Sequence, residues 1–212
     1  MPIDPYLYPG TEILQNHFGI KDEQNLKEME AEFTSLRLSQ IAENPLTGNY
    51  DTAHACEMHR FIFSDIFGWA GKFRTIDIEK AEFVLGGISI EYTHHKEIES
   101  ALTQTLNDMK SESWLNYSLE QQAEKFSRHI SKVWRIHPFR EGNTRTITHF
   151  CCQYADSIGM YIDRRVFEDN IRYFRSALVA ACAVFKDLGD RSKPEYLNKI
   201  VMDALQKGHM LK

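Results

Sequence analysis

The sequence contains no long hydrophobic run among its 212 residues. Its longest apolar stretch, SALVAACAVF at residues 176–185, is about half of the roughly 20 residues that a membrane-spanning helix needs. The N-terminal MPIDPYLYPG lacks the basic and then apolar pattern of a signal peptide. Both absences predict a cytoplasmic protein without a membrane partner.

Cysteine is scarce, and an excess of positive charge is missing. The four cysteines form no CxxC pair, so neither a disulfide framework nor cysteine-bound zinc is expected, and a reducing compartment fits best. Lys and Arg number 25 against 30 Asp and Glu, which gives a formal net charge of −5. Since proteins that bind nucleic acid usually carry a basic face, we expect no nucleic-acid partner.

The pattern of apolar residues predicts one mostly helical domain. A first helix is expected to begin near residue 21 and to end at Asn44-Pro45, and Asp51 is expected to cap a second helix that ends at Gly68. Alternating residues on both sides of a Gly-Gly break predict one β-hairpin at 73–92. Further helices are expected at residues 95–110, 118–135, 143–158 and 165–187 and after Pro194. We expect an N-terminal arm at 1–18, the domain at 19–207 and a tail at 208–212.

One cluster of polar, charged and glycine residues stands out between two predicted helices. It reads HPFREGNTR and runs from His137 to Arg145. Apolar residues on each side follow one helical face, so the cluster is predicted to be the loop that joins two packed helices and opens the second. A helix N-terminus offers unpaired N–H groups and positive partial charge, which suit an anion. The imidazole of His137 can take a proton from a hydroxyl near neutral pH.

The other side chains of this loop suit the handling of phosphate. Arg140 and Arg145 bring fixed positive charge. Glu141 is an oxygen ligand suited to Mg²⁺ that bridges phosphates. Gly142 lets a ligand approach the backbone closely, and Asn143 can cap the helix or donate to an oxyanion. A capped turn with surface charges is the alternative interpretation.

The same residues resemble the signature of the Fic (filamentation induced by cAMP) family, HPFx[D/E]GN[G/K]R, at every fixed position except Thr144. The resemblance extends from about Gly19 to about Leu205 and includes LTGNYD at 46–51 and IFSDIFGWAGKFR at 62–74. It implies the Fic fold, a helical bundle with a β-hairpin flap. It also implies a bacterial, Mg²⁺-dependent transfer of AMP from ATP to a hydroxyl of a target protein or of the protein itself.

The resemblance gives roles to the residues of the loop. His137 would be the general base on a Ser, Thr or Tyr of the target, and Glu141 would hold the Mg²⁺ between the α- and β-phosphates. The amides of Gly142 and Asn143, with the Asn143 side chain, would form the anion hole, and Arg145 would neutralise the leaving phosphates. The expected nucleotide-binding residues are Arg140, Glu141, Gly142, Asn143, Thr144, Arg145 and Tyr173, the last of which could equally be a core tyrosine.

The expected hairpin corresponds to the family's flap, here called the flap segment, at about residues 77–92. Lys80, Glu82 and Phe83 near its first strand would dock the modifiable segment of the target, because an exposed strand edge can pair with a peptide main chain. An ordinary surface hairpin is the alternative.

Two departures from the family bear on rate and control. Thr144 replaces Gly or Lys, and we expect nucleotide binding to survive with an altered rate. Ser39-Gln-Ile-Ala-Glu43-Asn44 matches the family's inhibitory motif [S/T]xxxE[G/N] in letters, but Thr148 stands where that motif's arginine partner is expected. Ser39, Glu43 and Asn44 also suit a plain helix surface and C-cap, so weak inhibition at most is expected.

Other readings stay open. The fold could use another donor and transfer UMP, phosphocholine or phosphate. Thr144 leaves this alternative open because it departs from the family signature. It could also be a non-catalytic module that binds nucleotide or a partner, although His137 argues against this. An antitoxin-like inhibitor and a homodimer are further candidate partners. His94 and His95, with Glu91 or Glu97, suggest a metal site, but surface histidines are favoured because no third ligand stands at helical spacing.

Overall fold

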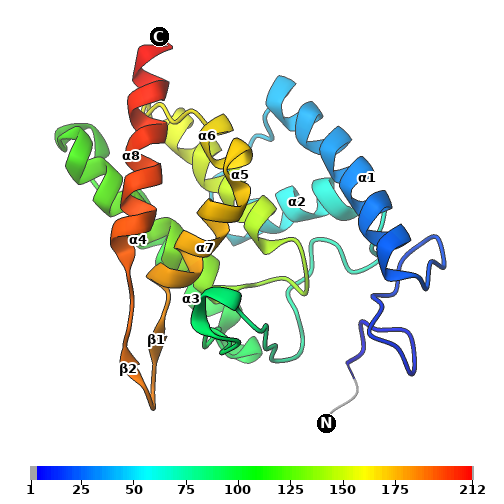
Figure 1. Cartoon of the computed structure of the whole chain (residues 1–212). Helices are drawn as coiled ribbons and strands as arrows, with labels where there is room; N and C mark the ends of the chain where they lie inside the picture. Colours follow the sequence, from blue (N-terminus) through cyan, green and yellow to red (C-terminus); the bar gives the residue numbers. More distant parts are fainter. Residues whose placement is uncertain (1–3, 212) are drawn as a thin grey trace.

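The structure, a computed structural model, describes residues 4–211 and is built mainly of α-helices (Figure 1). The predicted fold class, mostly helical with one small hairpin, is confirmed. The helices are α1 (Glu23–Glu43), α2 (Thr52–Phe63), α3 (Ile98–Lys110), α4 (Leu119–Ile136), α5 (Asn143–Ser157), α6 (Arg165–Asp169), α7 (Ile171–Ala181) and α8 (Pro194–Met210). Two short strands, β1 (Val184–Phe185) and β2 (Gly189–Asp190), pair antiparallel.

Helix α4 lies at the centre of the bundle. It packs against α8, α7, α3 and α5, while α5 packs against α2, and α2 against α1. The chain of contacts therefore runs from α8 on the left of Figure 1 to α1 on the right. A capping box at Ser118 and Gln121 starts α4, and Phe126, Ile130 and Trp134 are fully buried on its apolar face. This rigid centre ends at the loop that the sequence singled out.

The first two predicted helices begin as expected. Asp22 and Asp51 accept hydrogen bonds from the first turns of α1 and α2, and Asn44 is the C-cap of α1. Helix α2 ends at Phe63, before the predicted Gly68, and the chain continues in turns. Most of the tail expected at 208–212 is the last turn of α8, and residues 1–3 of the expected arm lie outside the described part.

The predicted helix at 165–187 is wrong. It is interrupted at Asn170, whose φ of −117° leaves the helical region, and it ends at Ala181. The chain then forms the β1–β2 hairpin, in which Val184 pairs with Asp190 and Phe185 with Gly189. Gly189 has a φ of 73°, a left-handed conformation that favours a turn over a continued helix.

The predicted hairpin at 73–92 is also wrong, because β1 and β2 are the strands that residues 4–211 form. The flap segment has two extended arms around a 3₁₀ turn at Phe83–Leu85, and Gly86 follows with a φ of 65°. Its backbone bonds are local: Leu85 N–H and Gly87 N–H both donate to Glu82 O. Between the arms, Lys80 N–H donates to the Ser89 hydroxyl rather than to a carbonyl. Side-chain bonds thus replace the ladder that the alternation suggested.

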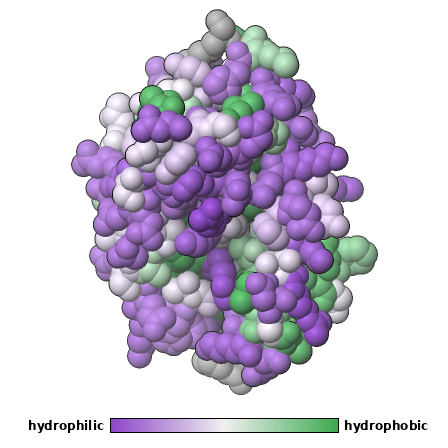
Figure 2. All heavy atoms as spheres, turned by 90° about the vertical axis from the view of Figure 1, so that its left-hand side faces the viewer, coloured by the Kyte–Doolittle hydropathy of each residue, from purple (hydrophilic) through white to green (hydrophobic). Residues whose placement is uncertain are grey.

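The surface has the mixture of hydrophilic and apolar residues that an ordinary globular composition predicts. Hydrophilic residues cover most of the face that the left side of Figure 1 presents, with smaller hydrophobic patches (Figure 2). None of the helices formed by residues 4–211 has the length and apolar character needed to cross a membrane.

Candidate active site

The loop at residues 137–145, here called the signature loop, joins the end of α4 to the start of α5. His137 is the C-cap of α4 and has a left-handed backbone, with φ 50° and ψ 59°. A non-glycine residue in this region stores strain of about 1–3 kcal/mol, which surrounding contacts must hold. Those contacts include the ring of Tyr92, whose centroid lies 4.2 Å from that of the imidazole, and Trp134, which meets it edge-on at 5.2 Å.

The imidazole of His137 is set up as a neutral base. His137 is 3% exposed, and its Nδ1 lies 3.3 Å from Trp134 O. Since a carbonyl only accepts, Nδ1 carries the proton, and Nε2 keeps a lone pair that no described residue engages. Burial lowers the pKa of His137 well below its usual range, and the charge of Lys80 lowers it further.

Arg74, which the sequence analysis did not single out, holds the start of the signature loop. Its Nε donates to His137 O at 2.8 Å, and its backbone N–H donates to Pro138 O at 2.8 Å. The guanidinium also reaches Ile76 O at 2.7 Å and Thr93 O, so it links the loop to both ends of the flap segment. The side chain is completely buried. The sequence feature that could have pointed to Arg74 is its place as the last residue of the mostly apolar stretch at 62–74.

Asn143 fixes the middle of the loop with its side chain. The carboxamide accepts from Phe139 N–H at 2.9 Å and donates to Phe139 O at 2.8 Å. The carboxamide oxygen and one of its two N–H donors are used inside the loop, so the second side-chain N–H and the backbone N–H are the donors left for a ligand. The first N–H groups of α5 have no partner within the helix, as at every helix N-terminus.

His59 on α2 is a second residue that the sequence analysis missed. Its Nδ1 accepts from Gly71 N–H at 2.8 Å, so Nε2 carries the proton and donates to Glu141 O at 3.1 Å. The ring stacks on Phe139 with a centroid distance of 3.9 Å. Burial lowers the pKa of His59 to about 4, so the imidazole is neutral at pH 7. No short motif marks this contact, because the two residues lie far apart in the sequence.

Gly142 is required by the backbone and by space. Its φ is 79°, and a Cβ built on it would lie 2.3 Å from Phe63 Cζ. Its N–H donates to Glu141 Oε1 at 3.0 Å, while Glu141 Oε2 lies 2.9 Å from Lys80 Nζ. Burial alone would raise the pKa of Glu141, but the charge of Lys80 and the Gly142 N–H outweigh it and lower the pKa to about 2. The carboxylate is therefore ionised and suited to a hard cation.

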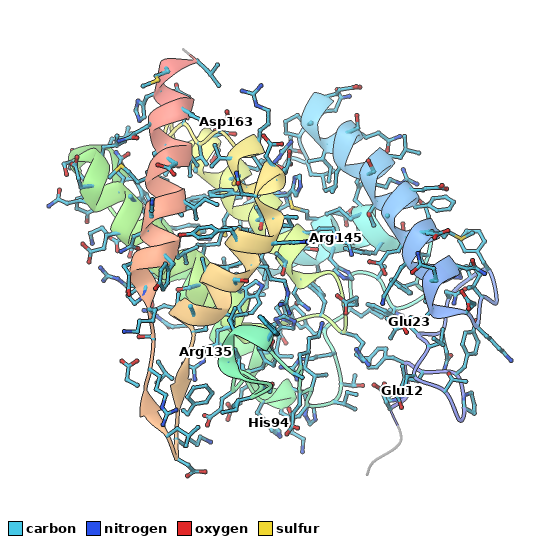
Figure 3. The ribbon with its side chains drawn as sticks, viewed as in Figure 1. Glu12, Glu23, His94, Arg135, Arg145 and Asp163 are labelled. Atoms are coloured by element: carbon cyan, nitrogen blue, oxygen red, sulfur yellow. The ribbon has the colours of Figure 1, made fainter. Side chains whose placement is uncertain are left out.

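Both arginines of the signature loop are already paired. Arg140 forms an ion pair with Asp4 at 2.8 Å. Arg145 lies between the start of α5 and α1 (Figure 3), where it pairs with Glu30 and donates to Thr34 Oγ1 at 2.8 Å. Its guanidinium also lies 5.0 Å from the centre of the Phe63 ring. A phosphate at the start of α5 would compete with Glu30 for Arg145.

Thr144, the departure from the family signature, connects the two helices of the site. Its Oγ1 accepts from Trp134 Nε1 at 2.9 Å, and its carbonyl accepts from Thr148 Oγ1 at 2.7 Å. Because the same Trp134 contacts the ring of His137, Thr144 is joined to His137 through one side chain.

The three predicted docking residues of the flap segment point in different directions. The Lys80 ammonium faces Glu141. Glu82 is 1% exposed and forms a two-bond ion pair with Arg175, at 2.7 and 2.8 Å. A docking role for Glu82 therefore does not agree with its burial. Phe83, by contrast, is 96% exposed at the tip.

Tyr173 and Glu43 form no hydrogen bond or ion pair with the signature loop among the described residues. Tyr173 is exposed, and its hydroxyl donates to Tyr196 O at 3.2 Å. Glu43 is exposed at the end of α1, next to the C-cap Asn44. Ser39 lines a cavity of about 490 Å³ that Arg145 and Thr148 also line. On α1, Glu30 rather than Glu43 engages the signature arginine.

Comparison with known proteins finds related sequences. The sequence model of the Fic/DOC family matches residues 49–155. The protein adenylyltransferase VbhT of Bartonella schoenbuchensis is 31% identical over 161 residues, which cover 76% of this chain and 32% of that protein. The probable protein adenylyltransferase Fic of Salmonella typhimurium is 32% identical over 141 residues, 66% of each chain. The chain thus spans about a third of the first relative's length and just under two thirds of the second's.

Solved structures share the fold. The BepC protein of Bartonella tribocorum, crystallised with bound AMPPNP, superposes with a TM-score of 0.76 over 94% of this chain and 95% of that chain, at 22% identity. The N-terminal Fic domain of a Bartonella effector from strain AR 15-3 gives a TM-score of 0.76 at 24% identity over 98% of this chain and 93% of that one.

Proposed function

Since the chain belongs to the Fic/DOC family, we propose that it is a protein adenylyltransferase, which transfers AMP from ATP to a Ser, Thr or Tyr hydroxyl of a target protein and of itself. One observation carries the proposal: the buried Nε2 of His137, in the loop that leads into α5, keeps a lone pair that no described residue engages. A module that only binds nucleotide has no use for a base at this point.

His137 takes the proton in the proposed reaction. The target oxygen attacks the α-phosphorus, the bond to the β-phosphate oxygen breaks, pyrophosphate leaves, and the hydroxyl proton passes to Nε2. The Nδ1–H that faces Trp134 O keeps the ring in the required tautomer. Negative charge from a bound triphosphate would raise the pKa of His137 and strengthen it as a base.

Glu141 and the start of α5 would hold the nucleotide. The ionised carboxylate fits Mg²⁺, which usually takes one or two carboxylates together with phosphate oxygens and water. Mg²⁺ held there would neutralise phosphate charge. Lys80 would then leave Glu141 and pair with another group. The Asn143 N–H, together with the Gly142 N–H once it is released from Glu141 Oε1, would stabilise charge that develops on the α-phosphate. Arg145 and Arg140 would stabilise the leaving phosphates after they give up their acidic partners, Glu30 and Asp4.

Labelled ATP tests this proposal. Wild type and His137→Ala would be incubated with Mg²⁺, with and without cell lysate, and with ATP labelled at the α- or the γ-phosphate. We expect protein labelling from the α-position only, and a loss of at least about 100-fold in His137→Ala, the usual contribution of a general base. Labelling from the γ-position would replace the proposal with phosphate transfer. Nucleotide binding without any labelling would favour another donor, such as UMP or phosphocholine, or a binding module.

We propose that control of this site acts through α1 and its cavity. The cavity beside Arg145 would suit a partner such as an antitoxin-like inhibitor, while a homodimer is a further assembly to test by light scattering. Because Glu43 is exposed and forms no ion pair within residues 4–211, Glu43→Gly is expected to raise the rate of labelling by much less than tenfold. A larger activation would assign inhibition to the Ser39–Asn44 motif. The four free cysteines support a reducing, cytoplasmic setting.

A further inference from the structure

Three metal-ligating side chains meet at the base of the flap segment. Asp77 stands at its start, and His94 and His95 come just after its end. One ligand atom from each residue lies within 4.8 Å of the others. The Asp77 carboxylate is 3.2 Å from His94 Nε2 and 3.2 Å from His95 Nδ1, and the two ring centroids are 4.4 Å apart. His94 lies at the edge of the molecule (Figure 3), where an ion can enter.

The distance from each imidazole nitrogen to the Asp77 carboxylate suits a transition-metal ion. Zn²⁺ bonds of about 2.0–2.2 Å to His nitrogen and Asp oxygen place tetrahedral ligands roughly 3.3 Å apart. Two imidazoles and one carboxylate favour borderline ions such as Zn²⁺, Co²⁺ or Ni²⁺ over Mg²⁺, which prefers oxygen ligands. The backbone N–H of His95 donates to Asp77 Oδ1 at 2.8 Å and so orients the carboxylate.

The competing contacts of the cluster are weak. His94 Nδ1 accepts from Lys96 N–H at 3.4 Å, so its ring proton now lies on Nε2. A metal on Nε2 would move that proton to Nδ1, so it would break the long bond from Lys96 and take the place of the 3.2 Å contact between Nε2 and Asp77 Oδ2. Arg74 Nη1 is 3.5 Å from Asp77 Oδ1, while the other oxygen, Oδ2, faces His94.

We propose that Asp77, His94 and His95 bind one divalent transition-metal ion of the Zn²⁺ class, and that this ion fastens the two ends of the flap segment together. Such a link removes conformational freedom from the whole segment between its ligands. Arg74 donates both to Thr93 O at the same base and to His137 O, so the fastened base is directly connected to the signature loop. A search for ligands at helical spacing from His94 and His95 misses Asp77, because Asp77 lies at the opposite end of the flap segment.

Metal titration of tag-free protein tests the site. Zn²⁺ binding would be followed by calorimetry, and Co²⁺ binding by its visible absorption spectrum. We expect one equivalent to bind, and the affinity to fall at least about tenfold in His94→Ala and in His95→Ala. Two controls should keep the wild-type affinity: His209→Ala removes an exposed histidine on α8, and Glu141→Gln removes the carboxylate expected to hold Mg²⁺. Equal Zn²⁺ affinity in the wild type and both cluster variants would overturn the site.

Protection of the flap tests the fastening. Chymotrypsin should cut at the exposed Phe83, and Zn²⁺ should slow this cut at least about threefold in wild type and His209→Ala but not in His94→Ala. Melting curves in EDTA check that each variant folds. Zn²⁺ binding that leaves the cleavage rate at Phe83 unchanged would overturn the fastening.

Discussion

The signature loop and the flap segment are both irregular stretches that frame His137, yet they are held in opposite ways. In the loop, bonds from the distant Arg74 and His59 and from the loop's own Asn143 side chain fix the backbone. In the flap segment, most backbone bonds join close neighbours around the 3₁₀ turn, and the Phe83 side chain stands in solvent. The contrast suggests that the loop is preorganised for chemistry, while the flap is left adaptable for a target.

The largest effect is expected from one substitution made in each region. Gly142→Ala and Gly86→Ala both place a Cβ on a left-handed backbone, with φ of 79° and 65°. Only the first meets a neighbour, Phe63, so we expect the unfolding free energy to fall by at least about 3 kcal/mol for Gly142→Ala and by about 1 kcal/mol for Gly86→Ala. Urea denaturation measures both. Equal losses would mean that the loop is no more constrained than the flap.

Acid should weaken the loop through His59. The pKa of His59 is about 4 in the folded protein and about 6.5 in an unfolded chain, so the unfolded state binds the proton first as the pH falls. The neutral His59 imidazole therefore makes its full contribution to the free energy of unfolding above about pH 6.5. As the pH falls towards 4, about 3 kcal/mol of that free energy is lost. Denaturation between pH 7 and pH 4.5 should show a smaller loss in His59→Gln than in wild type. His209→Gln serves as the control, and an unchanged loss in His59→Gln would contradict the assignment.

A smaller difference in stability loss between the loop and the flap is expected when one hydrogen-bonding side chain is removed from each. Asn143→Ala removes two buried bonds to Phe139, whereas Ser89→Ala removes the acceptor of Lys80 N–H in the partly exposed flap. We expect losses of about 2–3 kcal/mol for Asn143→Ala and below about 1 kcal/mol for Ser89→Ala, by thermal melting. The reverse order would show that the flap is held as tightly as the loop.

Phe83→Ala should have the smallest effect on folding and a clear effect on the target. Because Phe83 is 96% exposed, the unfolding free energy should change by less than about 0.5 kcal/mol. Labelling of proteins in lysate from α-labelled ATP should fall several-fold while ATP affinity stays the same, since the side chain would contact only the target. Unchanged target labelling would remove Phe83 from docking.

Local pattern predicted most of the helices and the loop that joins α4 to α5. Periodic apolar faces define α4 and α5, and a cluster of charged residues and glycine between them marks the signature loop. The same reasoning misjudged the flap, because alternating residues predict strands whether or not a side chain such as Glu82 turns inward to Arg175. His59 and Arg74 were missed for a related reason. Each acts on a backbone carbonyl far along the chain, and a carbonyl leaves no trace in the sequence.

The buried guanidinium of Arg74 has a consequence for how the molecule opens. One side chain donates to Ile76 O and Thr93 O at the two ends of the flap and to His137 O in the loop. If any one of these segments moved away, the charged group would lose bonds in an apolar setting, which is costly. The three segments should therefore exchange their amide hydrogens together, as a single cooperative unit, while the tip of the flap exchanges on its own.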